Sequence, residues 1–337
     1  MNRPNLTVAI CTFNGAQRVP KVLERLKLQS TSLQIPWEIL VVDNNSDDDT
    51  EEVIKKYQST WDCGVPLHYK REYKRGLGFA RQCAVQVSRA PWVGFLDDDN
   101  LPAENWIECI YNFQQEHPHA GVFGGRIKGV YEVSPPKYFE RIERFWAIGG
   151  GGKKICYTSS SYPHRRKRIY PPGAGAVVNR EAWLAFVPPS LTLQGRSAGK
   201  KLPGEDIEAF SYIRNGGLEI WYNPSMVVEH LIPKERLRKD YIYDLMWRTG
   251  LSRYYTRRTA YSKREYMAMA ILFWFNDLRK LLIHLFRKKD QEEIVSTAEK
   301  LLILGSLVSP ILTRKSEPLS LSSKWIQKDA KNEQSYS

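Results

Sequence analysis

The sequence predicts an α/β protein with a mostly parallel central sheet and flanking helices. In the first half of the 337-residue chain, short apolar runs alternate with segments of helical periodicity, which is typical of successive β–α units. Several of these runs end in polar or acidic residues, and open α/β sheets bind ligands at the carboxyl ends of their strands. Apolar residues make up 42% of the chain, which is enough for a sizeable core.

The expected elements follow from periodicity in chain order. Strands are expected at residues 6–11, 38–42, 65–70 and 92–96, and helices at 19–28, 50–57 and 78–87. Residues 126–172 and 188–203 are rich in proline, glycine or basic residues and predict loops over the sheet. Further helices are expected at 180–185 and 205–215, and short strands at 220–221 and 226–228.

Composition limits the partners and the compartment. The formal net charge of +13 favours anionic partners, namely nucleotides, phosphorylated lipids, an acidic membrane surface or nucleic acid. Five cysteines without CxxC spacing indicate free thiols in a reducing compartment. Neither a secretory signal nor a run of about 18 uncharged apolar residues is visible, so we expect a cytoplasmic protein without a spanning helix.

The chain beyond residue 233 differs in composition. Residues 234–290 hold 15 Lys and Arg against 6 Asp and Glu, with tyrosines and tryptophans between them. Within 267–286 an apolar stripe that includes Met267, Ile271, Trp274 and Leu278 recurs at helical spacing. Two interpretations stay open: a basic amphipathic helix at the inner face of a membrane, or packing on the rest of the chain or on another copy. Residues 313–337 predict a disordered tail.

Three acidic stations carry the functional signal. Asp97, Asp98 and Asp99 directly follow a buried strand, where adjacent like charges favour a bound cation such as Mg²⁺ or Mn²⁺. A solvated acidic turn is the alternative. Asp43 also ends a strand, although for this aspartate taken alone an Asx-turn is the better explanation.

The third station, Glu205 and Asp206, starts a predicted helix, which they could simply cap. Judged together, the three stations suit a site that holds a nucleotide, a divalent ion and a base.

These segments resemble family 2 glycosyltransferases of the GT-A fold over roughly residues 5–233. The matching segments are VAICTFN at 8–14, VVDNNS at 41–46, RGLGFAR at 75–81, DDD at 97–99, GAGA at 173–176 with REA at 180–182, and ED at 205–206. The resemblance implies a catalytic domain at 1–233, and the change in composition predicts a basic, aromatic helical extension at 234–312. The resemblance further implies transfer of a sugar, with inversion, from a nucleotide-diphosphate sugar to a hydroxyl of a polysaccharide or glycolipid acceptor.

The resemblance also implies roles for individual residues. It assigns the nucleotide-sugar site to Thr12, Asn14, Asp43, Gly76, Arg81, Asp97 and Asp98. Within this set Asp43 would bind the base, Arg81 would stand near the base or the phosphates, and Asp97 would touch the ribose. Asn100 and Arg75 depart from the family pattern, which leaves open whether the donor is a UDP-, GDP- or dTDP-sugar.

The same resemblance assigns Asp99, with His230 as a weaker second ligand, to Mn²⁺ or Mg²⁺, and Asp206 with Glu205 to catalysis. A divalent ion stabilises the charge of a leaving nucleoside diphosphate. A carboxylate such as Asp206 accepts the proton of the attacking hydroxyl. A single base opposite the leaving group implies one displacement and therefore inversion.

Two other functions compete with this interpretation. A nucleic-acid-binding protein would use the basic aromatic C-terminal region, but the strand-end acids would then repel phosphate, so no nucleic-acid partner is expected. A sugar nucleotidyltransferase would need a glycine-rich, basic phosphate loop after the first strand, and residues 11–18 match it poorly.

Overall fold

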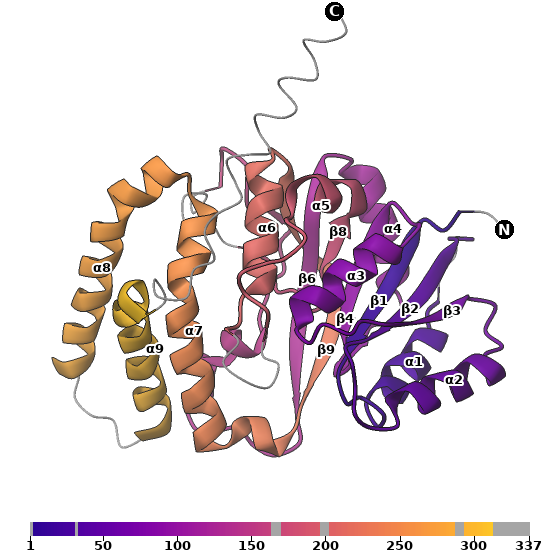
Figure 1. Cartoon of the computed structure of the whole chain (residues 1–337), viewed down its shortest axis with the longest axis horizontal. Coiled ribbons are helices and arrows are strands. Elements are labelled where there is room, and N and C mark those ends of the chain that lie inside the picture. Colours follow the sequence, from indigo (N-terminus) through magenta and orange to yellow (C-terminus); the bar gives the residue numbers. More distant parts are fainter. Residues whose placement is uncertain (1–2, 31–32, 163–169, 196–201, 287–292, 313–337) are drawn as a thin grey trace, which may run out of the picture.

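The computed structural model describes residues 3–30, 33–162, 170–195, 202–286 and 293–312. The described residues form a layered α/β body with a group of long helices at one end (Figure 1). The predicted tail at 313–337 and parts of the two predicted loops, 163–169 and 196–201, lie outside the described residues.

One half of the central sheet is parallel. It contains, in spatial order, β3 (Leu67–Arg71), β2 (Trp37–Asp43), β1 (Leu6–Thr12) and β4 (Trp92–Asp97). The register pairs Thr12 of β1 with Asp43 of β2, and Cys11 of β1 with Asp97 of β4. The predicted strand-end acids of β2 and β4 therefore lie at one edge of the sheet, separated by a single strand.

The other half of the sheet mixes directions. It contains β8 (Val177–Asn179), β6 (Ala120–Tyr131), β9 (Glu219–Ile232), β5 (Asn100–Pro102) and β7 (Ile155–Cys156). β9 runs parallel to β6, whereas β8 is antiparallel to β4 and β6, and β5 and β7 are antiparallel to β9. Most of the described strands therefore run in one direction, which confirms the predicted fold class.

Two sequence predictions for this half were wrong. The two short strands expected at 220–221 and 226–228 are parts of one long strand, β9, whose pairing with β6 shifts between Tyr222 and Val227. Pro224 lies in this gap and has no N–H to donate to the ladder. The loop expected from residue 126 begins later, because β6 continues to Tyr131 and is followed by η1 (Phe139–Arg141) and η2 (Glu143–Trp146).

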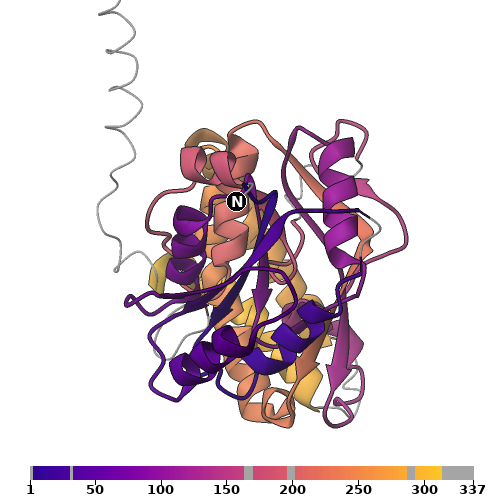
Figure 2. The same ribbon diagram turned by 90° about the vertical axis from the view of Figure 1, so that its right-hand side faces the viewer.

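Helices cover both faces of the sheet (Figure 2). One face carries α1 (Val19–Lys27), α2 (Thr50–Thr60) and α4 (Trp106–Glu116), and the other carries α3 (Leu77–Val87), α5 (Arg180–Phe186) and α6 (Glu205–Asn215). In β1, Val8 and Ile10 join the first core and Ala9 the second, because successive side chains point to opposite faces. The five cysteines all lie in described segments and form no disulfide.

The C-terminal helices form a third layer. They are η4 (Lys234–Leu237), α7 (Lys239–Ala260), α8 (Lys263–Phe286) and α9 (Glu293–Leu312). A separate core joins Phe139 and Trp146 to Ile242 of α7 and Leu302 of α9. Figure 1 shows α8 at the outer edge of this layer. The domain division at residue 233 stays a prediction.

One of these helices bears on the expectation that no segment spans a membrane. Among the described residues, Ile294–Leu312 of α9 is long and apolar enough to do so. Only its length and composition suggest that it could span a membrane, and core helices of soluble proteins have the same length and composition. Val295, Ala298 and Leu302 of this segment are buried in the third core.

Candidate functional site

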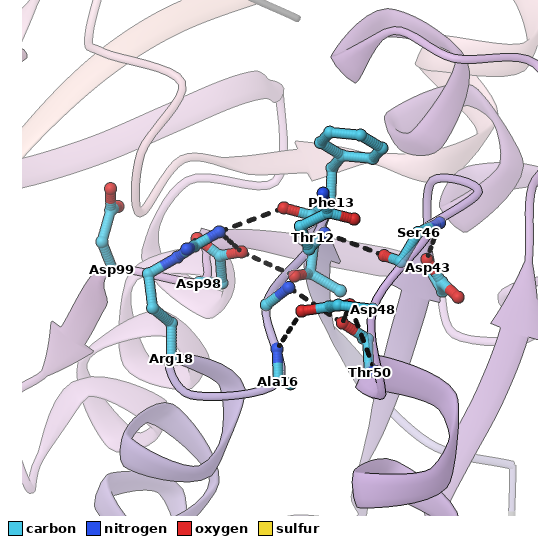
Figure 3. Close-up of polar contacts among 12 residues, drawn as sticks. Thr12, Phe13, Ala16, Arg18, Asp43, Ser46, Asp48, Thr50, Asp98 and Asp99 are labelled. Carbon is cyan, nitrogen blue, oxygen red and sulfur yellow. Dashed lines mark hydrogen bonds and ion pairs between the residues drawn. The ribbon is translucent and has the colours of Figure 1, made fainter.

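The turn after β1 forms the floor of the candidate site. Asn14 has a positive φ of 52°, and its backbone N–H donates to Ser46 Oγ at 2.9 Å. The N–H of Gly15 donates to Thr50 Oγ1 at 2.9 Å. A side chain at Gly15 would place its Cβ 1.9 Å from Thr12 Oγ1, so only glycine fits. These contacts fix the turn predicted to line the nucleotide (Figure 3).

Asp43, predicted to bind the base, is completely buried in this structure. Its Oδ1 accepts a hydrogen bond from the N–H of Ser46, and its Oδ2 accepts one from the Tyr69 hydroxyl, both at 2.9 Å. Burial, followed by the hydrogen bond to Asp43, raises the pKa of Tyr69. Asp43 thus shapes the turn after β2, in the manner of the Asx-turn alternative.

The glycine segment before α3 joins the same edge. Gly76 has a φ of +142°, which side chains rarely adopt. Its N–H donates to Asn44 Oδ1 at 2.6 Å. Gly76 therefore connects the start of α3 to the turn after β2, and it does so through backbone.

Arg81 of α3 links two of the three acidic stations. Its Nη2 donates to Asp97 Oδ1 at 3.3 Å and its Nη1 to Glu205 Oε1 at 3.1 Å. Burial lowers the pKa of the Arg81 guanidinium, but the charges of Asp97, Glu205 and Asp206 outweigh it and raise the pKa overall. Arg81 is 3% exposed, so it joins Asp97 at the end of β4 to α6 from inside the protein.

Glu205 and Asp206 differ sharply in environment. Glu205 is buried, and its burial, with a further contribution from the charge of Asp206, raises its pKa to about 7 even though Arg81 opposes the shift. Asp206 is only partly buried, and its Oδ2 accepts a hydrogen bond from the N–H of Gly173 at 2.8 Å. Of the two, Asp206 is the carboxylate that solvent reaches.

Gly173 allows this close arrangement because it has no side chain. A Cβ at this position would lie 2.5 Å from Arg81 Nη1 and 2.9 Å from Asp206 Cβ. The family-like segment at 173–176 therefore lies against both Arg81 and the predicted base.

Asp98 is held from the first turn. Arg18 donates to it twice, from Nε to Oδ1 and from Nη2 to Oδ2, each at 2.9 Å. The hydroxyl of Thr12 donates to Oδ2 at 2.5 Å. Burial and the neighbouring Asp99 raise the pKa of Asp98, although Arg18 lowers it. Figure 3 shows Arg18 reaching across the turn toward Asp98, so Asp98 ties the turn to β4.

Asp99, the predicted metal ligand, is paired with Arg236 of η4 and lies near His230 of β9. Its Oδ2 lies 2.7 Å from Arg236 Nη1 and 3.5 Å from His230 Nε2. His230 Nδ1 lies 2.7 Å from the carbonyl oxygen of Trp146. Because a carbonyl only accepts, Nδ1 carries the proton, and Nε2 presents its lone pair to Arg236 Nη1 at 3.1 Å.

Sequence reasoning missed Arg18 and Arg236. Arg18 belongs to a segment considered only as a poor phosphate loop, and Arg236 stands among many other basic residues after residue 233. Neither matches a motif. A pocket of about 460 Å³ near Arg25 and Glu229 is lined by none of the predicted residues.

The edge of the sheet thus gathers the three acidic stations around Thr12 and Arg81. A family model described as "Glycosyl transferase family 2" matches residues 7–174, which include the first two stations. The chain belongs to glycosyltransferase family 2. The interpretations as a nucleic-acid-binding protein and as a sugar nucleotidyltransferase are therefore set aside.

This glycosyltransferase is similar in sequence to several known proteins. The chain is 22% identical to the glucosyl-dolichyl phosphate glucuronosyltransferase of Haloferax volcanii, over 70% of this chain and 72% of the relative. It is 28% identical to the poly(ribitol-phosphate) β-N-acetylglucosaminyltransferase TarP of Staphylococcus aureus, over 40% of this chain and 41% of that protein.

A solved structure shares the fold. The mannosyltransferase PcManGT of Pyrobaculum calidifontis, in complex with GDP-Man and Mn²⁺, superposes with a TM-score of 0.59 at 17% identity, over 94% of this chain and 89% of that chain. The similarity supports the GT-A fold of this glycosyltransferase, including its C-terminal helices.

The side chains around Asp99 provide only part of a coordination shell for a divalent ion. The described residues contain no group of three or more His, Cys, Asp or Glu side chains able to hold a metal. Asp99 and His230 offer one carboxylate and one imidazole nitrogen, and Mg²⁺-type ions often take their other ligands from substrate phosphates and water. Arg236 occupies the Asp99 oxygen that an ion would use, so it would have to move.

Proposed function

We propose that this glycosyltransferase is an inverting, metal-dependent enzyme that transfers a sugar from a nucleoside-diphosphate sugar to a hydroxyl of a polysaccharide or glycolipid acceptor. The observation that supports it best is the linkage between Asp97 and Glu205 through Arg81. It joins the end of β4, where Asp99 stands, to the start of α6, where Asp206 stands. A donor and an acceptor could therefore meet between these two elements.

On the donor side, Thr12, Asn14 and Asp97 are proposed to contact the nucleoside. Asp99 and His230 would hold a Mn²⁺ or Mg²⁺ ion, which would neutralise charge on the diphosphate. Arg236, once displaced from Asp99, would remain within reach of the same phosphates, because its η4 helix directly follows β9. Asp98 is better suited to a positioning role, since Arg18 and Thr12 bind both of its oxygens.

On the acceptor side, Asp206 is proposed as the general base. Its carboxylate accepts the hydroxyl proton while the acceptor oxygen bonds to the anomeric carbon. The bond from that carbon to the diphosphate oxygen breaks, and the nucleoside diphosphate leaves with the electron pair. Arg81, with its pKa raised by Asp97, Glu205 and Asp206, keeps a positive charge beside this base. Attack opposite the leaving group inverts the anomeric configuration.

Asp43 is proposed to support binding of the nucleobase. Both oxygens of Asp43 already bind Ser46 and Tyr69. A nucleobase would have to replace the Tyr69 hydroxyl, or else contact the turn that Asp43 shapes. Both routes make the residue necessary for donor affinity.

The acceptor class is proposed from the relatives. The names of two of them refer to glucosyl-dolichyl phosphate and to poly(ribitol-phosphate), and both of these carry phosphate. The net charge of +13 suits an anionic acceptor of either kind. A cytoplasmic location, with attachment to the inner face of a membrane, is proposed with it.

A donor screen tests the function. Purified protein with Mn²⁺ or Mg²⁺ is incubated with UDP-, GDP- and dTDP-sugars, and release of nucleoside diphosphate is measured with and without acceptor. We expect one nucleotide to be preferred and Asp99→Ala to abolish release in a folded protein. Turnover of every donor at the uncatalysed rate, or full activity of Asp99→Ala, would contradict the proposal.

A further inference from the structure

Helix α8 turns its apolar side away from the protein. Of its 24 residues, the buried one is Asp277. Met267, Ile271, Phe275 and Phe286 are 66%, 65%, 58% and 86% exposed. Their spacing places them within about 100° of the helix circumference. The apolar stripe seen in the sequence is therefore neither packed on the catalytic body nor part of the core.

Polar contacts hold the opposite side of α8. The carboxylate of Asp277 lies 2.8 Å from Arg257 Nη2 and 4.0 Å from Arg253 Nη1, both of α7. The hydroxyl of Ser306 in α9 donates to Asp277 at 2.6 Å. The carboxylate thus lies near both arginines. Burial, followed by the charge of Arg257, lowers the pKa of Arg253 to about 10, although Asp277 opposes this shift.

These contacts set the rotation of the helix. Turning the apolar side inward would move Asp277 into solvent and leave Arg253 and Arg257 without the carboxylate that neutralises them in a buried place. The contacts to α7 and α9 thus favour outward exposure of the apolar face. Soluble monomers rarely expose so long an apolar surface, and 24 helical residues extend about 36 Å.

We propose that the outward face of α8 lies in the interface of a lipid bilayer that contains anionic lipids. Charge favours this partner, because the exposed charged residues of α8 include Lys263, Arg264 and Arg279, against Glu265 alone. Basic side chains beside an apolar stripe reach lipid phosphates while the stripe enters the acyl boundary. If this face instead bound a second copy of the chain symmetrically, Arg264 and Arg279 would lie against the apolar stripe of that copy and not against phosphates.

Vesicle flotation of the full chain tests the proposal. Vesicles of phosphatidylcholine alone are compared with a roughly 3:1 mixture of phosphatidylcholine and phosphatidylglycerol at about 100 mM salt. We expect wild type to float with the mixed vesicles. Ile271→Glu combined with Phe275→Glu lowers the bound fraction by about tenfold or more, because both side chains leave apolar surroundings. The substituted positions are exposed, so the fold is retained, as circular dichroism checks.

A matched control adds the same charges elsewhere. The control variant carries Val133→Glu and Val87→Glu. Val133 lies in a loop and Val87 in α3, and each is 44% exposed. We expect this variant to bind vesicles at the wild-type level. Arg264→Gln with Arg279→Gln reduces binding to the mixed vesicles more than to phosphatidylcholine.

Three results would overturn the proposal. The first is that wild type floats with neither kind of vesicle. The second is that the α8 double variant floats as well as wild type. The third is that the control variant loses as much binding as the α8 variant. Light scattering tests the alternative partner, a second copy of the chain. If wild type is a dimer that does not bind vesicles, and Ile271→Glu with Phe275→Glu converts it to a monomer, the face is a contact between copies. None of these readouts depends on sugar transfer.

Discussion

Arg236 Nη1 lies 2.7 Å from Asp99 Oδ2, so a basic residue occupies the oxygen expected to bind a divalent ion. His230 Nε2 is 3.1 Å from the same guanidinium nitrogen. The ion pair keeps Asp99 neutralised in its buried position after β4, and the proposed divalent ion would have to replace it. This competition makes Arg236 a residue whose effect on metal binding is measurable without any substrate.

Arg236→Gln is expected to tighten Mn²⁺ binding to the donor-free protein by several-fold to about tenfold, because the ion no longer competes with a guanidinium for Asp99. His230→Ala weakens Mn²⁺ binding, and Asp99→Asn removes it. Electron paramagnetic resonance of free Mn²⁺ measures all three. The control is Arg238→Gln, which removes an exposed ion pair with Asp240. Unchanged affinity in Arg236→Gln would separate Arg236 from the ion site.

Asp206→Asn is expected to reduce transfer by roughly 10²–10⁴-fold, the usual contribution of a general base. Donor binding is expected to stay close to wild type, since Asp206 is proposed to act on the acceptor. Initial rates and donor titration by calorimetry provide the two measurements. Asp240→Asn removes an acid from the first turn of α7 in the same way and leaves the rate unchanged. A parallel loss of donor affinity would place Asp206 in the donor site.

Gly173→Ala is expected to lower transfer at least about tenfold. The new Cβ would lie 2.5 Å from Arg81 Nη1 and 2.9 Å from Asp206 Cβ, and misplacement of a catalytic group is costly. Arg81 is buried and cannot swing aside freely. The control is Gly151→Ala, because nothing lies within 4 Å of a Cβ there. Equal transfer rates for both variants would show that the segment around Gly173 can shift without disturbing Arg81 or Asp206.

Glu205 is expected to make stability depend on pH. Its pKa is raised from the ordinary value of 4.5 to about 7, so between these values the folded protein binds a proton that the unfolded chain has released. Stability from this group is therefore present below about pH 4.5 and falls as pH rises to 7, by at most about 1.4 kcal/mol per pH unit. Denaturant unfolding from pH 4.5 to 8 measures it.

The comparison uses Glu205→Gln, which cannot titrate and should give a flatter profile over this window. Glu181→Gln, in the first turn of α5, should follow the wild-type profile. A Glu205→Gln profile as steep as that of wild type would assign the pH dependence to another group.

Asp277→Ala is expected to reduce the free energy of unfolding by about 3–5 kcal/mol, because it leaves Arg253 and Arg257 without their buried counter-charge. Asp244→Ala, which removes an exposed i,i+4 pair with Arg248, should cost less than about 1 kcal/mol. Thermal and urea unfolding compare the two. Similar losses would mean that Asp277 does not hold α8 in place.

Local patterns were sufficient for the parallel half of the sheet. The strand expected at 6–11 is β1, Leu6–Thr12, and the helix expected at 205–215 is α6. They were less informative for β6, where Gly125 lowers the strand signal. A Cβ at Gly125 would lie 1.7 Å from the carbonyl oxygen of Met226, so this glycine reflects the close approach of β9, a long-range contact that no local window contains.

The sequence by itself determined the fold class and the order of the acidic stations, because strand and helix periodicity and strand-end acids are local features. Its motifs also resemble those of family 2 glycosyltransferases. Only the tertiary structure decided what each acid contacts: Arg81 for Asp97 and Glu205, Arg18 for Asp98, and Arg236 for Asp99. It also decided that α8 faces outward. The physical reason is that ion pairs and the rotation of a helix depend on groups far apart in the chain, whose encounter periodicity does not encode.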